Sequence, residues 1–303
     1  MKSEKRHWFK FALQTKGSVI PIIAPRVIWT GLFGVFVSIL YYYKLPVSQP
    51  FVGGVVPSIV LGLLLVFRTN TAYERFWEGR RLWGMLTSDI RNLAWQIWVV
   101  VNEVEPEDRV KKIAALRLVT AFAVASKLYL RAQPVNRELE ALVSPSQYLQ
   151  LKNIDNSPLE IAHWIGSYIQ QQYNRNCITN APQVAAMLTL TRNLMDSLGN
   201  CERILRAPLP LAYAIHLKQL VLIYCLLLPF QLVKDAGLWT GMIVALISFT
   251  LFGIEEIGIE IENPFGYDAN DLPLDTICDQ IKDNVEEFIN LNSSSEYDNQ
   301  KLR

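Results

Sequence analysis

The sequence lacks the short motifs by which many enzymes and metal proteins are recognised. It contains no G-x-S-x-G, no H-E-x-x-H, no Walker A loop and no dinucleotide-binding fingerprint. It has only four cysteines, far apart and without a C-x-x-C pair, which argues against a zinc site and a disulfide framework. They are Cys177, Cys201, Cys225 and Cys278. We therefore predict a protein that is not an enzyme.

The chain also lacks an excess of charge of one sign. Its 29 Lys and Arg and its 28 Asp and Glu leave a formal net charge of +1. Nucleic-acid-binding proteins usually carry a basic patch together with a recognition motif, and neither is present here. We expect no nucleic-acid partner.

Four long stretches lack charge altogether. Residues 27–43, 51–67, 219–233 and 236–254 contain no Asp, Glu, Lys or Arg. A helix needs about 20 mostly apolar residues to cross a bilayer, with a range of roughly 17–25. We therefore predict an integral, multi-pass membrane protein with four transmembrane helices in contact with lipid.

The basic residues lie beside these stretches in a pattern that predicts orientation. They precede the first stretch, follow the second and precede the third, whereas the turns inside each pair of stretches carry few of them. Cytoplasmic loops are enriched in Lys and Arg. Both termini and the central segment are therefore expected in the cytoplasm, with the protein in the plasma membrane or an internal membrane.

The region between the two pairs of stretches has apolar residues at helical spacing. Helices are predicted over 71–101, 107–131, 158–173 and 181–204, and no window alternates with the period of a strand. The fold class is therefore all-α with a cytoplasmic helical region. The expected segments are 1–26 (cytoplasmic N-terminal segment), 27–68 (transmembrane hairpin), 69–206 (cytoplasmic helical insert), 207–259 (second hairpin), 260–290 (acidic loop and C-terminal helix) and 291–303 (disordered tail).

The second apolar stretch carries a candidate pore-lining face. Val55, Ile59 and Leu63 are spaced i, i+4 and i+8, so they lie on one side of a helix. In a helix that is apolar all round, such a stripe can also be drawn without any special role. The spacing alone leaves both alternatives open.

Polar residues after the fourth stretch raise two further alternatives. Asn263, Asp268 and Asp271 place three oxygen donors near the turn-forming Pro264 and Gly266. Hard cations such as Ca²⁺ take oxygen ligands of this kind. The same residues can equally cap the neighbouring helices or form a turn. Just upstream, acids at 255, 256, 260 and 262 are expected to line a vestibule or to form a solvated helix end.

Three strings in the sequence resemble the bestrophin family, in particular its prokaryotic members. They are RTNTAYERFWEGRRLWG (68–84), APLPLAYAIHLKQLVLIYCLLLPF (207–230) and IENPFGYDANDLPLD (261–275). The matching signature residues are Arg68, Asn70, Tyr73, Arg75, Trp77, Glu78, Pro264, Phe265 and Gly266. The resemblance spans nearly the whole chain in the expected order.

The resemblance implies a homopentameric ion channel around one central pore. It implies a hydrophobic neck at Val55, Ile59 and Leu63, and permeant small ions as partners. It also implies a calcium clasp made by the side chains of Asn263, Asp268 and Asp271 with the backbone carbonyl of Glu260. No other cofactor is expected.

The ion that permeates is predicted to be an anion, chloride or bicarbonate. Basic residues near the membrane favour anions, whereas the acids after the fourth stretch favour cations. The aliphatic neck also differs from the phenylalanine rings of animal bestrophins. A cation-permeable channel of the same fold and a membrane-anchored scaffold that is not a channel are the alternatives.

Overall fold

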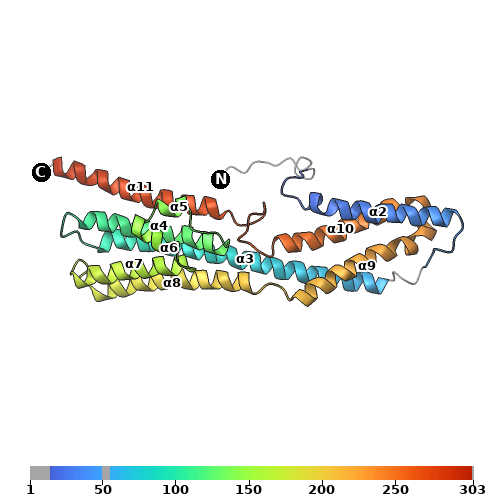
Figure 1. Ribbon diagram of the computed structural model, residues 1–303, viewed down its shortest axis with the longest axis horizontal. Helices are drawn as coiled ribbons and strands as arrows, with labels where there is room; N and C mark the ends of the chain where they lie inside the picture. The colour runs from blue at the N-terminus through green and yellow to red at the C-terminus, as the bar shows by residue number, and fades with distance from the viewer. Residues whose placement is uncertain (1–13, 50–54, 302–303) are drawn as a thin grey trace. The chain divides into compact units, whose positions relative to one another are not determined.

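A computed structural model describes residues 14–49 and 55–301, and within these ranges the secondary structure is helical with no strand (Figure 1). The all-α prediction is confirmed. The residues fall into two compact units, of which unit 1 comprises residues 1–77 and 207–271 and unit 2 comprises residues 78–206 and 272–303. The predicted segment boundaries, including 1–26, stay predictions.

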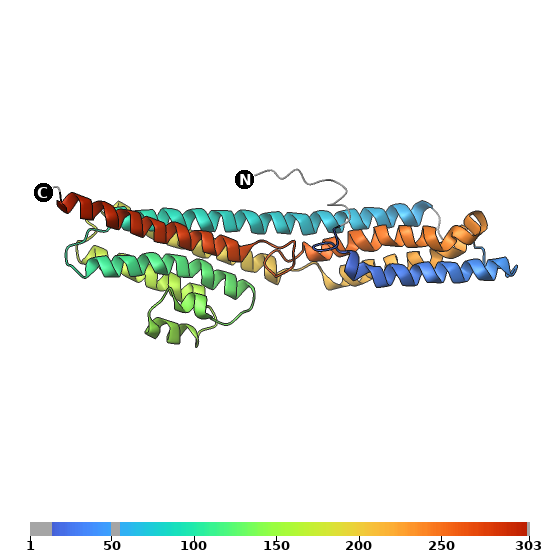
Figure 2. The same ribbon diagram turned by 90° about the horizontal axis from the view of Figure 1, so that it is seen from above.

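Unit 1 contains the four apolar stretches. They form α2 (Ile20–Tyr42), the first part of α3 (Val55–Val100), α9 (Leu211–Ala236) and α10 (Thr240–Glu260), and these run side by side in Figures 1 and 2. The most apolar windows of α2, of α3 and of residues 211–260 have mean hydropathies of 1.8, 1.3 and 1.9. At most 33% of any of these windows is buried inside the protein, so most of their apolar surface faces outward. Helices with this length and surface suit a bilayer.

A tight turn joins α9 to α10. The 3₁₀ helix η1 (Gly237–Trp239) separates them, and Gly237 has φ of 52°, a conformation that favours glycine. The Gly237 carbonyl accepts hydrogen bonds from the hydroxyls of Ser38 (3.1 Å) and Thr240 (2.7 Å). The fourth membrane helix therefore begins at Thr240, four residues later than the sequence predicts.

Helices α2 and α10 cross at glycines. An ideal Cβ at Gly34 would lie 2.9 Å from Gly241 Cα, and one at Gly31 would lie 3.1 Å from Ala245 Cβ. Small residues allow this close approach of two backbones, which is the usual way that membrane helices associate. The crossing therefore joins the first hairpin, which contains α2, to the second hairpin, which contains α10.

Helix α3 continues where two helices are predicted. It runs for 46 residues through Arg68-Thr69-Asn70-Thr71, a polar string that looks like the end of a membrane segment. The hydroxyls of Thr69 and Thr71 donate to the carbonyls of Leu65 (2.9 Å) and Phe67 (3.0 Å). These side chains satisfy themselves within the helix, and no proline interrupts it, so the helix does not stop.

Unit 2 is built around α4 (Asp108–Leu130). The remainder of α3 lies in this unit with α5 (Arg137–Glu140), α6 (Pro145–Leu151), α7 (Ser157–Asn174), α8 (Ala181–Arg206) and α11 (Leu274–Lys301). Figure 2 shows the short helices α5 and α6 at one side of this bundle. The apolar window of α4 has a mean hydropathy of 1.6, enough for a membrane span, but 78% of it is buried. We therefore assign α4 as the core of a helical bundle rather than as a lipid-facing helix.

The sequence misses α5 and α6 because that region is rich in turn signals. Helix α6 nevertheless carries a clear start signal, because Ser144 and Gln147 form a capping box ahead of Pro145. At the other end of the chain, α11 extends to Lys301, whereas residues 291–303 are predicted to be a disordered tail. The helix continues from an amphipathic segment in which Cys278, Ile281 and Val285 are buried.

Charged side chains fasten the start of α11 to α4. Asp275 accepts hydrogen bonds from Arg131 (2.8 Å) and Lys127 (2.9 Å), and Lys127 also donates to Glu138 of α5 (2.7 Å). Partial burial acts to raise the pKa of Asp275, but the hydrogen bonds from Arg131 and Lys127 outweigh it, and the pKa is lowered below its ordinary value of 3.8.

Candidate functional site

The candidate pore residues lie on the side of α3 that faces away from the rest of unit 1. Leu61, Leu65 and Arg68 are buried and pack toward the core, whereas the side chains of Ile59 and Leu63 are 62% and 53% exposed. Each residue turns an α-helix by 100°, so Ile59 and Leu63 lie almost opposite the buried residues. Val55 is the first residue of α3, and its side chain lies outside the described residues.

The signature residues that follow on α3 have different surroundings. Asn70, Tyr73 and Trp77 are exposed, as expected for aromatic and polar side chains at a membrane–water interface. Arg75 donates from Nε to the backbone carbonyl of Glu262 (3.2 Å) and from Nη1 to that of Ala207. Arg75 thereby connects α3 to the segments that precede α9 and follow α10.

Glu78 is the first residue of unit 2, and it pairs within that unit. Its Oε1 accepts a hydrogen bond from Nη2 of Arg203 at 2.8 Å, which connects α3 to α8.

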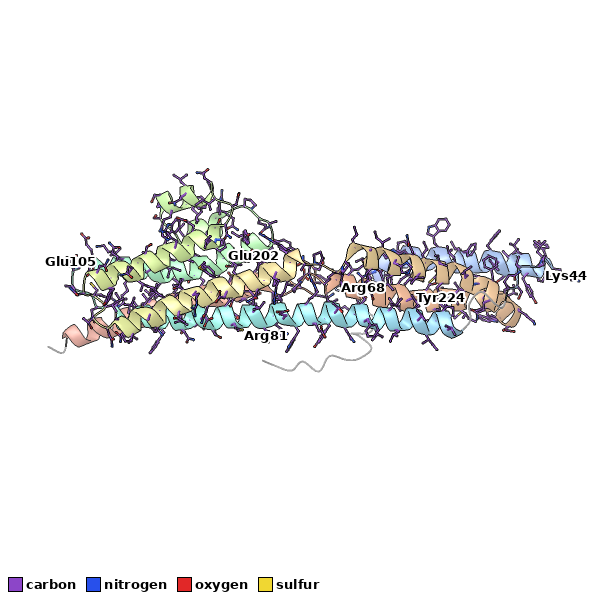
Figure 3. All side chains as sticks on the ribbon, turned by 90° about the horizontal axis from the view of Figure 1, so that it is seen from below. Lys44, Arg68, Arg81, Glu105, Glu202 and Tyr224 are labelled. Carbon is purple, nitrogen blue, oxygen red and sulfur yellow. The ribbon has the colours of Figure 1, made fainter. Side chains whose placement is uncertain are left out.

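Arg68 is almost completely buried. Only 2% of the residue is exposed, on the face of α3 that is packed against α9 and α10 in Figure 3. Its Nη1 lies 3.8 Å from Glu255 Oε1, and its Nη2 lies 3.7 Å from Glu262 Oε2. A buried charge is costly unless it is paired, so the two acids offset the charge of Arg68.

The acids after the fourth apolar stretch do not form a ring of free carboxylates. Glu255 and Glu256 are only 3% and 7% exposed. Glu256 accepts a hydrogen bond from Arg26 of α2 at 2.8 Å, and Glu262 accepts one from the backbone N–H of Leu209 at 3.0 Å. The expectation of a vestibule ring or a solvated helix end is wrong for Glu255 and Glu256. Burial among basic partners is the reason.

The loop after α10 is organised by its own hydrogen bonds. The backbone N–H of Phe265 donates to Asn263 Oδ1 (3.3 Å), and that of Asp268 donates to Asp271 Oδ2 (2.7 Å). The N–H of Asp271 donates back to the carbonyl of Asp268 at 3.0 Å, which closes a turn. These contacts support the turn alternative for Asp268.

The remaining loop residues pack tightly. Pro264 and Phe265 are buried, and Gly266 lies between two of the predicted calcium ligands. An ideal Cβ at Gly266 would lie 2.7 Å from Asp271 Oδ2 and 3.5 Å from Asn263 Nδ2. A side chain at this position would collide with Asp271, so glycine allows the Asp271 carboxylate to lie against residue 266.

The predicted calcium ligands are only partly gathered. Asn263 and Asp271 both lie beside Gly266, and the carboxylate of Glu260, whose backbone carbonyl is the predicted ligand, accepts a hydrogen bond from Asn270 at 2.6 Å. In the described part of the chain, no three His, Cys, Asp or Glu side chains are grouped so that they could hold a metal ion. Because Ca²⁺ takes 6–8 oxygen ligands, a site here would depend on amide and backbone oxygens as well.

The partners of Arg68 could not be read from the sequence. Glu255 and Glu262 lie nearly two hundred positions further along the chain, so no spacing rule connects them with Arg68. One signal was available, because acids at the end of an apolar membrane run must find a partner or reach water. It predicts that a partner exists but does not identify it.

A family model and individual relatives of known sequence agree on one protein family. The profile of a family described as "Bacterial/Fungal Bestrophin protein" matches residues 1–287. The voltage-dependent anion channel-forming protein of Nostoc sp. is 60% identical over 291 residues, which cover 96% of this chain and 94% of that protein. The protein of the same name from Synechocystis sp. is 54% identical, over 94% of this chain and 93% of its own.

Solved structures agree with this assignment. The crystal structure of a bacterial bestrophin homologue from Klebsiella pneumoniae superposes with a TM-score of 0.81 at 27% identity. The match covers 88% of this chain and 98% of that chain.

Proposed function

Because this chain belongs to the bestrophin family, we propose that it forms a homopentameric channel that passes anions, with chloride as the main ion and bicarbonate as a second. The observation that carries the proposal is the exposed apolar face of α3, at Ile59 and Leu63, in a chain that matches named anion channel-forming proteins along nearly its full length.

The neck of the pore is proposed to consist of Val55, Ile59 and Leu63. More than half of the surface of Ile59 and of Leu63 is left uncovered in unit 1, which supports a role in lining a path between subunits. A narrow ring of aliphatic side chains expels water when its helices approach, and it conducts when they separate. Such a gate needs no charged side chain.

The charges of unit 1 support anions over cations. The cation alternative rested on free glutamates after the fourth apolar stretch, and two of these, Glu255 and Glu256, are buried beside Arg68 and Arg26. Their negative charge is therefore offset locally. In the sequence, the basic residues at positions 2, 5, 6 and 10, before the first apolar stretch, outnumber the single acid of that segment, Glu4.

The topology follows from the same proposal. Both termini and the insert are assigned to the cytoplasm, and the two hairpins 27–68 and 207–259 cross the membrane. The excess of basic residues outside the hairpin turns supports this orientation.

Calcium binding in the loop after α10 is a separate proposal. Asn263 and Asp271, which both lie beside Gly266, would hold the ion together with Asp268 and the carbonyl of Glu260. The bound ion would add positive charge that holds the loop acids together. The loop hydrogen bonds already form without it.

The reversal potential of the purified protein in a planar bilayer tests the anion proposal. A tenfold ratio of concentrations corresponds to about 1.4 kcal/mol, and one charge crossing 100 mV corresponds to about 2.3 kcal/mol. A tenfold KCl gradient should therefore give a reversal potential of about 60 mV with the sign expected for chloride. A value of similar size and opposite sign would show that the channel selects cations. No current at all would favour the scaffold.

A further inference from the structure

Arg68 occupies a space in α10 that is shaped for it. An ideal Cβ at Gly258 would lie 3.3 Å from Arg68 Nε, 3.6 Å from Cδ and 3.7 Å from Cγ. The absence of a side chain at Gly258 thus leaves a notch for the Arg68 stem. A long charged side chain buried in such a notch fixes α3 against α10.

The guanidinium is held by charge rather than by close hydrogen bonds. Its distances to Glu255 and Glu262 are 3.8 Å and 3.7 Å, longer than the roughly 2.7–3.2 Å of a hydrogen bond. Within the described residues, Arg68 Nε, Arg68 Nη1 and Glu255 Oε1 are buried without a hydrogen-bond partner. The charge of Arg68 is thus shared between Glu255 on α10 and Glu262 in the loop that follows α10.

The second acid extends this connection to α9. Glu262 Oε1 accepts a hydrogen bond from the N–H of Leu209, and the carbonyl of Glu262 accepts one from Arg75 Nε. Arg68 and Arg75 are seven residues apart and lie on one side of α3. Two arginines of α3 therefore meet the same loop residue, once at its side chain and once at its backbone.

Leu63 of the neck precedes Arg68 by five residues, about 7.5 Å along the helix axis. We propose that Arg68, Glu255 and Glu262 are the positioning residues of the pore, which set where α3 lies and therefore how far apart the neck side chains are. This inference rests on the proposed function, because it takes Ile59 and Leu63 as the neck.

Two neighbouring acids of α10 provide a matched test. Glu255 faces Arg68 of α3, whereas Glu256 is paired with Arg26 of α2. Glu255→Gln and Glu256→Gln each remove one negative charge from adjacent positions of the same helix. Only the first removes a partner of α3.

Two measurements on the full-length protein separate the roles of these acids. The first is the open probability in planar bilayers, and the second is the rate at which a soluble thiol reagent modifies Leu63→Cys in each background. All four native cysteines are buried, so the introduced thiol is the one the reagent can reach in the folded protein. Glu255→Gln should shift both quantities by about tenfold, the size of a typical coupling between two sites. Glu256→Gln should change neither by more than about twofold, since its partner lies on α2.

Equal effects of the two substitutions, or no effect of either, would overturn the proposal. If the wild-type protein passes no current but the thiol rates still differ as expected, the channel function fails and the positioning role stands. If Glu255→Gln does not assemble, Glu262→Gln removes the other acid, whose side chain is 19% exposed. The same shift is then expected, and its absence would refute the role.

Discussion

The crossing of α2 and α10 predicts that alanine is not tolerated at Gly241. An ideal Cβ there would lie 2.4 Å from Val35 Cγ2, and 3.0 Å from both Gly31 O and Val35 N. Two of these atoms belong to the backbone and cannot rotate away. Ordinary contacts between heavy atoms are about 3.5–4.0 Å, so the helices would have to separate by roughly 0.5–1 Å.

The magnitude follows from two opposing effects. Overpacking in a closely packed site costs about 1–3 kcal/mol, and replacing glycine by alanine inside a helix gains about 1 kcal/mol. Gly241→Ala is therefore expected to destabilise unit 1 by up to about 2 kcal/mol. Gly253 of the same helix is the matched control, because a Cβ there would lie 3.7 Å from Ile23 Cδ1, an ordinary contact. Gly253→Ala should stabilise by about 1 kcal/mol.

Unfolding of the purified protein in mixed micelles, at increasing fractions of a denaturing detergent, measures the two changes. The expected result is a lower midpoint for Gly241→Ala and a higher one for Gly253→Ala. Midpoints that move by the same amount in the same direction would refute the argument that backbone contact at the crossing decides the outcome.

Three further predictions concern the neck, the loop and the docking of α11. Ile59→Ala should raise the conductance, because it widens a dewetted neck. The control Ile28→Ala truncates a side chain of similar exposure on α2 (60% against 62%) and should leave the conductance unchanged. Equal currents from the two variants would show that Ile59 is not part of the neck. Asp268→Ala should abolish any difference between currents recorded with calcium and with chelator. The control Asp283→Ala, on α11, should preserve that difference. Identical wild-type currents in the two solutions would exclude calcium gating. Because the pKa of Asp275 is lowered in the folded protein, its stabilisation is present above the ordinary value of 3.8 and is lost as the pH falls through the lower folded value. The difference in unfolding free energy between wild type and Asp275→Asn should be below about 1 kcal/mol, since the Asp275 side chain is 61% exposed. It should vanish at pH values below the folded pKa of Asp275. A difference that grows on acidification would contradict the stabilising role of Asp275.

The sequence predicts the helices of this protein well where apolar spacing is uninterrupted. The predicted helices at 107–131, 158–173 and 181–204 correspond to α4, α7 and α8 within two residues at each end. The errors occur where composition and structure disagree. The polar string at 68–71 resembles a boundary but continues α3, and the turn-rich stretch after α4 contains two short helices.

The candidate site is predicted less completely, because its contacts join distant parts of the chain. The i, i+4, i+8 spacing correctly places Ile59 and Leu63 on one face of α3, and their pore role stays a prediction. The notch at Gly258 and the pairing of Arg68 with Glu255 depend on how α3 packs against α10. A glycine in a predicted helix gives no indication of which side chain fills the space beside it.

The apolar character of α4 also affects how the chain must be made. Its mean hydropathy of 1.6 lies between those of α2 and α3, so hydropathy alone does not distinguish it from the helices that enter the membrane. Part of the surface that buries α4 comes from α11, which begins at Leu274 and is therefore synthesised long after α4. Until then an apolar helix remains incompletely covered, a state that is prone to aggregation or to wrong insertion. Helix α11 thus completes the folding of a segment that left the ribosome much earlier.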